Sequence, residues 1–319
     1  MTAYLASLLV FAGINALLAL GLNVVWGLGG MINLGLAGFF ALGAYASALL
    51  SLRLGWPMPL AGLAAVAVAA AAGTVLAAVT ARLKGDYLAL VTLGFAQVMQ
   101  LVAANERWLT NGTDGISGVP GPWRSALSPM QFDLLCMALC WGLVVVCWAG
   151  LARLGSSPFA RVLRAIREDE MVAEVAGKPV LWFKIRAFAL GAGVSGLAGS
   201  VYVHFNGYVA PDSLDVLLTL NVVLALTLGG TGRMAGAVVG ALLLEALTEG
   251  TRFMGGVLPA LSPVQVASLR EAVIGVVLIL VLRLRPQGVL PETSRILDLE
   301  ADDDERSRIA VPGRTLRGA

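Results

Sequence analysis

The chain has 319 residues, of which 58% are hydrophobic and only 13% are charged, and its mean hydropathy is +0.84. Soluble globular domains carry about 25% charged residues. This composition therefore leaves too little polar surface for a water-exposed fold and excludes an ordinary soluble domain. The net charge of +2 is too small to indicate a nucleic-acid partner.

The N-terminal part of the chain is uncharged from residue 1 to residue 52. Because a membrane-spanning helix needs about 20 apolar residues, this stretch is long enough for two crossings. Its first apolar segment is too long for a signal peptide and lacks preceding basic residues, so we expect a permanent span. Over the whole chain the hydropathy pattern predicts an all-α, polytopic transmembrane helix bundle of about nine spans, with a range of about eight to ten. We place these spans at 3–25, 31–52, 59–80, 87–104, 132–151, 187–205, 214–229, 235–250 and 270–284.

The segment 153–186 is the most basic part of the chain. Its positive charges are Arg153, Arg161, Arg164, Arg167, Lys178, Lys184 and Arg186. Loops rich in Lys and Arg stay on the cytoplasmic side of a membrane, so we expect this loop inside. Counting spans outward then places 105–130 and the N-terminus outside. The charged segment 291–319 is expected to be a disordered cytoplasmic tail that follows a transmembrane domain at 1–290.

Within the basic loop, residues 158–176 have the pattern of an amphipathic helix. Pro158 suits a first helical position, and Gly177 followed by Pro179 suits a helix end. An apolar stripe is formed by Phe159, Leu163 and Ile166, while three arginines lie on a different face. Two interpretations remain open: the helix lies on the lipid surface, or it docks a soluble partner.

Two motifs look like cofactor or metal sites, and we interpret both as packing. Residues 191–196 read GAGVSG and fit a dinucleotide-binding pattern, but they lie inside an apolar span and not in a strand–helix–strand unit. Small residues at such spacing let two membrane helices approach closely. Cys136, Cys140 and Cys147 share a helix face, where charged thiolates would be costly, so no metal is expected. We predict no cofactor.

Ionisable residues inside predicted spans are candidates for function. Glu245 and Glu249 lie one helical turn apart, with Arg252 close behind. We favour a structural Glu249–Arg252 ion pair, with a proton relay as the alternative. His204, the only histidine, is interpreted as an interfacial polar residue. No sequence fits a phosphate-binding loop, so the chain itself is not expected to hydrolyse ATP, and no catalytic constellation indicates an enzyme.

The ordered set of motifs resembles the permease subunits of bacterial branched-chain amino-acid ABC importers, of the LivM type. The resemblance runs from about residue 20 to residue 290. Its motifs are 22–27 (LNVVWG), 34–35 (LG), 39–40 (FF), 43–45 (GAY), 90–97 (LVTLGFAQ), 109–120 (LTNGTDGISGVP), 157–167 (SPFARVLRAIR), 228–232 (LGGTG) and 285–288 (RPQG).

The resemblance implies a multi-pass permease in the bacterial cytoplasmic (inner) membrane that passes leucine, isoleucine, valine or a related small neutral solute. It implies a second permease subunit, two ATP-binding subunits and a periplasmic or tethered solute-binding protein as partners. A secondary transporter driven by ions through Glu245 and Glu249 is the alternative. The residues expected to couple to the ATPases are Phe159, Arg161, Arg164, Ile166, Glu174 and Gly177. Candidates for the translocation pathway are Asn23, Asn33, Gln97 and Glu245.

Overall fold

The structure is a computed structural model that describes residues 2–124 and 126–252, together with residues 265, 268, 272–273, 275–277, 279–280, 283 and 288–290. The long helices are α1 (Thr2–Leu22, continued by a π-helix over Asn23–Leu28), α2 (Leu36–Leu54), α3 (Met58–Val79), α4 (Asp86–Asn105), α6 (Pro129–Ser156), α9 (Val180–Asn206), α10 (Val216–Gly229) and α11 (Met234–Arg252). The short elements are α5 (Arg107–Thr110), α7 (Pro158–Glu168), α8 (Glu170–Val175), two 3-10 turns (Gly112–Asp114 and Pro211–Leu214) and the antiparallel strands β1 (Ile116–Ser117) and β2 (Tyr208–Val209).

The helix content confirms the prediction of an all-α, polytopic membrane bundle. Among the described residues, seven helices are long and apolar enough to cross a membrane, and they match the first seven predicted spans. The predicted eighth span corresponds to α11. The span count itself stays a prediction, because seven of the fifteen residues of 270–284 lie outside the described residues. The tail 291–319 and the domain boundary at 290 also stay predictions, because residues 291–319 lie outside the described residues.

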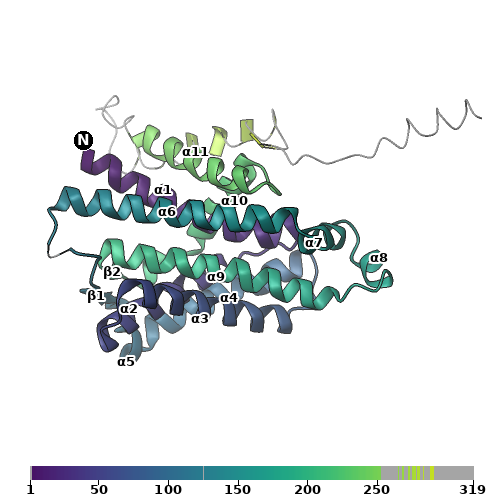
Figure 1. Ribbon diagram of the computed structural model, residues 1–319, viewed down its shortest axis with the longest axis horizontal. Helices are drawn as coiled ribbons and strands as arrows, with labels where there is room; N and C mark the ends of the chain where they lie inside the picture. The colour runs from purple at the N-terminus through teal and green to yellow at the C-terminus, as the bar shows by residue number, and fades with distance from the viewer. Residues whose placement is uncertain are drawn as a thin grey trace, which may run out of the picture.

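The long helices lie side by side and alternate in direction (Figure 1). One end of the bundle carries α5, β1 and β2 together with the start of α1, and the opposite end carries α7 and α8 (Figure 1). This arrangement puts the loops at 105–130 and 153–186 at opposite ends, in agreement with the predicted outer and cytoplasmic sides.

The central helix is α9, which packs against α1, α2 and α3. Glycines allow this packing. A Cβ atom added at Gly43 of α2 would fall on the backbone of Gly196, and one added at Gly196 would lie 2.7 Å from the carbonyl oxygen of Ala65 in α3. The small residues of 191–196 therefore serve helix contact, as predicted. No strand–helix–strand unit exists among the described residues that could support a dinucleotide site.

Between α1 and α2 the chain leaves the helical conformation at residues 29–35, so the predicted second span begins later than residue 31. Amide groups freed by this break would be costly inside a membrane. Side chains satisfy them: the N–H groups of residues 34, 35 and 37 donate to oxygens of Thr92 in α4, Asn33 and Thr219 in α10, at 3.0, 2.9 and 3.0 Å. The start of α2 is thereby tied to two other helices.

The glycine contacts at α9 yield a test with a matched control. In Gly196→Ala the new methyl group meets the Ala65 backbone, and overpacking of this kind costs about 1–3 kcal/mol. In Gly142→Ala, on an open face of α6, the new methyl group meets nothing within 4 Å, and alanine favours the helix by up to about 1 kcal/mol. We expect the first variant to lower the thermal unfolding midpoint in detergent and the second to leave it equal or higher. Equal midpoints for both would contradict the packing role of Gly196.

Candidate functional site

The loop between α6 and α9 forms α7 and α8 at the end of the bundle (Figure 1). Pro158 is the first residue of α7, as predicted. The Ser157 side chain does not cap α7 and instead donates to the carbonyl of Leu154 at 2.6 Å. The predicted stripe is confirmed: Leu163 and Ile166 are buried, and the Phe159 ring stacks on Phe183 of α9 with centroids 5.4 Å apart. This helix therefore packs on the ends of the membrane helices.

The predicted single helix over 158–176 is wrong, because the chain breaks at Asp169. This residue has extended backbone angles, and its carboxylate accepts hydrogen bonds from the N–H groups of Met171 and Val172 at 2.8 and 3.1 Å. Aspartate favours such a helix-starting position over a helix interior. The break turns the second part, α8, into a separate short helix at the tip of the loop.

The tip of the loop exposes apolar side chains on the surface of the protein. Met171, Val172 and Val175 are 70%, 65% and 84% exposed, whereas Ala173 is buried. We call these three residues the α8 apolar tip. Gly177, with a φ of +75°, ends the turn after α8 in a conformation that favours glycine. Glu174 is exposed beside the tip.

An ion cluster holds α8 against the bundle. The Glu170 carboxylate lies 2.7 Å from the ammonium of Lys184 in α9 and 3.0 Å from that of Lys84 in the α3–α4 turn. Lys184 is only 7% exposed, so it depends on this carboxylate for its charge partner. Burial by itself would raise the pKa of Glu170, but hydrogen bonds and charges from Lys184 and Lys84 outweigh it and lower the pKa.

The arginines of α7 have different roles. Arg161 is exposed. Arg164 is half-buried and donates to the carbonyl of Gly155 at 3.0 Å, which braces α7 on the end of α6. Arg167 donates to the carbonyl of Gly27 in the π-helix that ends α1, and its side chain packs on Gly30. This arginine links α7 directly to a transmembrane helix.

The four pathway candidates have different surroundings. Asn23 is buried and linked to the α10–α11 turn, since its amide accepts from the N–H of Gly232 at 2.9 Å and donates to the carbonyl of Arg233 at 3.0 Å. Asn33 is buried and accepts from the nearby N–H of Gly35. Gln97, in contrast, is exposed on α4.

The acidic residues of α11 both contact α1. Asn15 donates to Glu245 at 3.1 Å, and the Tyr4 hydroxyl donates to Glu249. The predicted Glu249–Arg252 pair cannot be followed because the Arg252 side chain lies outside the described residues. These contacts join two helices and support the structural interpretation of both acids.

His204 is buried, so its interpretation as an interfacial residue is wrong. One ring nitrogen, Nδ1, lies 2.7 Å from the carbonyl oxygen of Pro120, which can only accept, so Nδ1 carries the proton. The other, Nε2, then accepts from the hydroxyl of Ser47 in α2 at 3.0 Å, and Ser47 also contacts Ser200 at 2.8 Å. This network joins the outer loop to α2 and α9. Its partners lie far apart in sequence, so no local pattern of residues predicts it.

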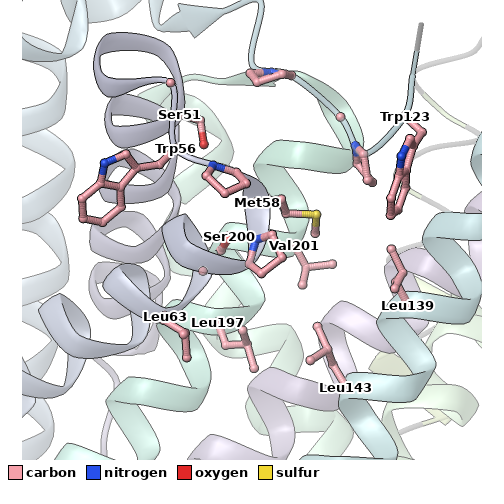
Figure 2. Close-up of a pocket in the computed structure, with 17 residues that line it drawn as sticks. Ser51, Trp56, Met58, Leu63, Trp123, Leu139, Leu143, Leu197, Ser200 and Val201 are labelled. Atoms are coloured by element: carbon pink, nitrogen blue, oxygen red, sulfur yellow. The ribbon is translucent and has the colours of Figure 1, made fainter. Parts of the chain in front are cut away.

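Beside this network lies a cavity of about 790 Å³ between α3, α6 and α9, roofed by residues 120–123 (Figure 2). A second pocket, of about 500 Å³, lies at the same end and is lined by Arg124 and Asp133 among others. Among the described residues, no three His, Cys, Asp or Glu side chains lie close enough to hold a metal ion.

A comparison with protein families matches residues 4–282 to the family described as the permease component of branched-chain amino acid transport systems. The chain belongs to this family. The match confirms the resemblance to LivM-type permeases, and it agrees with the prediction of a transport subunit that is not an enzyme. With the seven apolar helices, it also supports a multi-pass membrane protein.

Individual relatives give the same result. The LivM permeases of the high-affinity branched-chain amino acid transport systems of Salmonella typhimurium and Escherichia coli are 32% and 33% identical to the chain over 289 and 288 residues. These alignments cover 82% of this chain but only 64% of each relative, so the chain spans less than two thirds of their length. The autoinducer 2 import permease LsrC of Yersinia pseudotuberculosis is 26% identical over 162 residues, which is 49% of this chain and 43% of LsrC. No solved structure matches the chain.

The structure adds two contacts that sequence reasoning missed. Glu170, Lys84 and Lys184 form one cluster, although Lys84 and Glu170 lie 86 positions apart in the sequence. Arg167 reaches a backbone carbonyl 140 positions away. Charged residues in a loop are normally interpreted as solvated, so no local sequence pattern predicted either of these contacts.

The ion cluster predicts that removing the charge of Glu170 lowers the stability of the protein, whereas removing that of the nearby Glu174 does not, and that the effect at Glu170 depends on pH. Glu170→Gln leaves Lys184 buried without its carboxylate and should cost about 1–3 kcal/mol, whereas Glu174→Gln changes an exposed side chain. We expect the unfolding midpoint to fall only in the first variant. The pKa of Glu170 is lowered, so its stabilisation is present at neutral pH and is lost as the pH falls below its ordinary value of 4.5. A difference between wild type and Glu170→Gln that persists undiminished at lower pH would contradict the ionic role.

Proposed function

We propose that the chain is the membrane-spanning subunit of an ATP-driven importer in the bacterial cytoplasmic membrane. It passes leucine, isoleucine, valine or a related small neutral solute inward. A second permease subunit completes the pathway, two ATP-binding subunits dock on the cytoplasmic side, and a periplasmic or tethered binding protein delivers the solute. Membership of the family and the transport function named for the LivM relatives support this proposal.

The observation that carries the proposal is the α8 apolar tip. Three large apolar side chains stand 65–84% exposed at the end of a loop that carries seven basic and four acidic residues. Lying flat on a lipid surface would suit a longer helix with a continuous apolar face, whereas α8 has six residues and its apolar side chains project from the loop. A soluble partner with an apolar groove fits this shape better than a lipid surface does.

The contacts behind the tip suit it to transmit movement. The Glu170 cluster joins α8 to α9 and to the α3–α4 turn, and Arg167 joins α7 to the end of α1. A displacement of the tip by closing ATP-binding subunits therefore acts on three groups of membrane helices at once. Of the predicted coupling residues, Arg161 and Glu174 remain candidates for direct contact because they are exposed. Phe159, Arg164 and Ile166 position α7, and Gly177 ends the turn after α8.

For the pathway we propose the face formed by α4 and α10. Gln97 of α4 and Asn221 of α10 are both exposed within apolar helices, and the two helices are in contact. A carboxamide that faces hydrocarbon loses its hydrogen bonds with water at a cost of several kcal/mol. This face therefore suits contact with the second permease and an aqueous pathway. Asn23, Asn33 and Glu245 fit structural roles instead, since each has a hydrogen-bonding partner on the protein.

A pull-down from native membranes tests the partners and the docking role together. We expect the tagged chain, extracted in mild detergent, to retain a second permease and ATP-binding subunits. In Val175→Glu a carboxylate would have to enter an apolar contact, so the ATP-binding subunits should be lost. In the control Val175→Ile the surface stays apolar, so they should remain.

Other results of this experiment would point elsewhere. Equal recovery from Val175→Glu and Val175→Ile would contradict docking through the tip. Recovery of the chain alone, from a preparation that still transports, would reject the ATP-driven importer. In that case uptake should collapse in Glu245→Gln, as the ion-coupled alternative predicts.

The pathway face predicts an uptake defect without loss of assembly. Gln97→Leu and Asn221→Leu should each lower solute uptake by about tenfold, the effect of losing roughly one hydrogen bond in the rate-limiting state. The control Val98→Leu changes an exposed apolar side chain on the same helix and should leave uptake unchanged. The measurement is uptake into reconstituted vesicles at equal amounts of assembled complex. Unchanged uptake in both amide variants would show that the pathway runs elsewhere.

A further inference from the structure

The cavity of about 790 Å³ at the outer end of the bundle has four walls. They are the end of α2 with the start of α3, the outer half of α6, the outer half of α9, and a roof formed by residues 120–123. Figure 2 shows Met58, Val201, Leu139 and Leu143 around the open space, with Trp56 and Trp123 on opposite sides. Its volume lies within the range of about 300–1,000 Å³ that is usual for small-molecule sites.

The lining has almost no polar capacity to offer a ligand. Among the residues that the structure describes, no charged side chain lines the cavity, and away from the two tryptophans its only polar side chains are Ser51 and Ser200. Both serine hydroxyls already have hydrogen-bonding partners in the protein: Ser200 contacts Ser47 at 2.8 Å, and Ser51 contacts His204 at 3.5 Å. An amino acid would find no partner for its two charges here. The 500 Å³ pocket with Arg124 and Asp133 differs in this respect.

The cavity also lies at a particular depth. Leu139 and Leu143 of α6 are ten and fourteen residues beyond Pro129, where the helix begins, which places them about 15 and 21 Å along the helix. Trp56 and Trp123 lie near the outer end, as tryptophans do at a membrane boundary. Since the hydrocarbon core is about 30 Å thick, the cavity extends roughly through one leaflet.

The cavity reaches the surface between α3 and α6. Leu63 of α3 and Leu139 of α6 both line it and are both exposed. Between the cavity and Arg153 near the end of α6, the exposed large side chains of these helices are apolar, among them Val75 in α3 and Val145 and Val146 in α6. This is the character of a surface that faces lipid, in contrast to α4 and α10 with their exposed amides.

We propose that this cavity holds one acyl chain of a phospholipid from the outer leaflet. An apolar space gives water too few hydrogen-bonding partners, so it favours an apolar occupant. The acyl chain enters between α3 and α6 and lies along α9, while its head group stays at the level of the tryptophans. The bound chain fills the space beneath the outer loop, next to the His204 network.

The experiment uses membranes that contain the full chain with its natural partners. They are loaded with a phosphatidylethanolamine that carries a photoreactive diazirine on its acyl chain, and labelled peptides are identified by mass spectrometry after illumination. Two variants fill the cavity from opposite walls: Gly62→Leu, whose added Cβ atom would lie 3.4 Å from the Ser200 oxygen, and Leu139→Trp. The control Gly150→Leu adds the same side chain where nothing lies within 4 Å of the new Cβ atom.

We expect labelling of the wild type at Met58 and Leu143, above the labelling at the surface residues Val75 and Val146. Each filling variant should lower the cavity labelling by about tenfold, because it takes the room of roughly two chain methylenes. The control variant should not change it. Cavity labelling equal to that of Val75 and Val146, or unaffected by both filling variants, would overturn the proposal and leave only the annular lipid.

A second outcome would also overturn it. If Gly62→Leu and Leu139→Trp expel the second permease from the complex, and the wild-type cavity is not labelled, then a partner protein fills the space. Labelling is measured independently of uptake and of ATP hydrolysis. The proposal of an acyl-chain site can therefore be rejected while the importer assignment is kept. The importer assignment can likewise be rejected while the acyl-chain site is kept.

Discussion

The structure depends on the close approach of helix backbones around α9. Inside a membrane, lipid tails are as apolar as leucine, so hydrophobic burial alone gives helices little reason to prefer each other to lipid. Contacts at Gly43, Gly196 and Gly199 replace that driving force with tight van der Waals packing, because an added Cβ atom at any of them would meet a neighbouring backbone. The middle of α9 is thereby fixed against α2 and α3.

Because its middle is fixed, α9 connects the two ends of the molecule. With 27 residues it is about 40 Å long. Near its start, at the end predicted to be cytoplasmic, Lys184 holds Glu170 of α8. Near its outer end, Ser200 and His204 hold α2 and the outer loop. In the proposed coupling, a movement of the α8 apolar tip would therefore be passed to a single helix that ends at the loop 105–130 and borders the proposed lipid cavity.

The sequence allowed the bundle to be predicted, but only part of the site. Apolar length determines which segments span a membrane, so seven described spans agree with the predictions. The amphipathic spacing of Phe159, Leu163 and Ile166 likewise predicted the buried face of α7. The helix break at Asp169 was missed because the apolar stripe continues to Ala173 across it, although aspartate at such a position is a signal for a helix start. The Glu170 cluster and the His204 network join residues distant in sequence, and no local pattern encodes such pairs.

The distribution of polar side chains over the exposed faces links the proposed solute pathway to the proposed acyl-chain site. On α3 the exposed Thr74 donates to the carbonyl of Ala70 and so satisfies its hydroxyl within the helix, which lets this face lie against lipid. The carboxamides of Gln97 and Asn221 are too long and carry too many donors and acceptors to be satisfied in that way, so α4 and α10 favour water or protein. On the two proposals, the same bundle separates a face for the solute pathway from a face for lipid, and the apolar cavity opens on the lipid side. An acyl chain bound there would contact α9 directly, so the lipid would act on the helix that we propose carries movement from the α8 apolar tip.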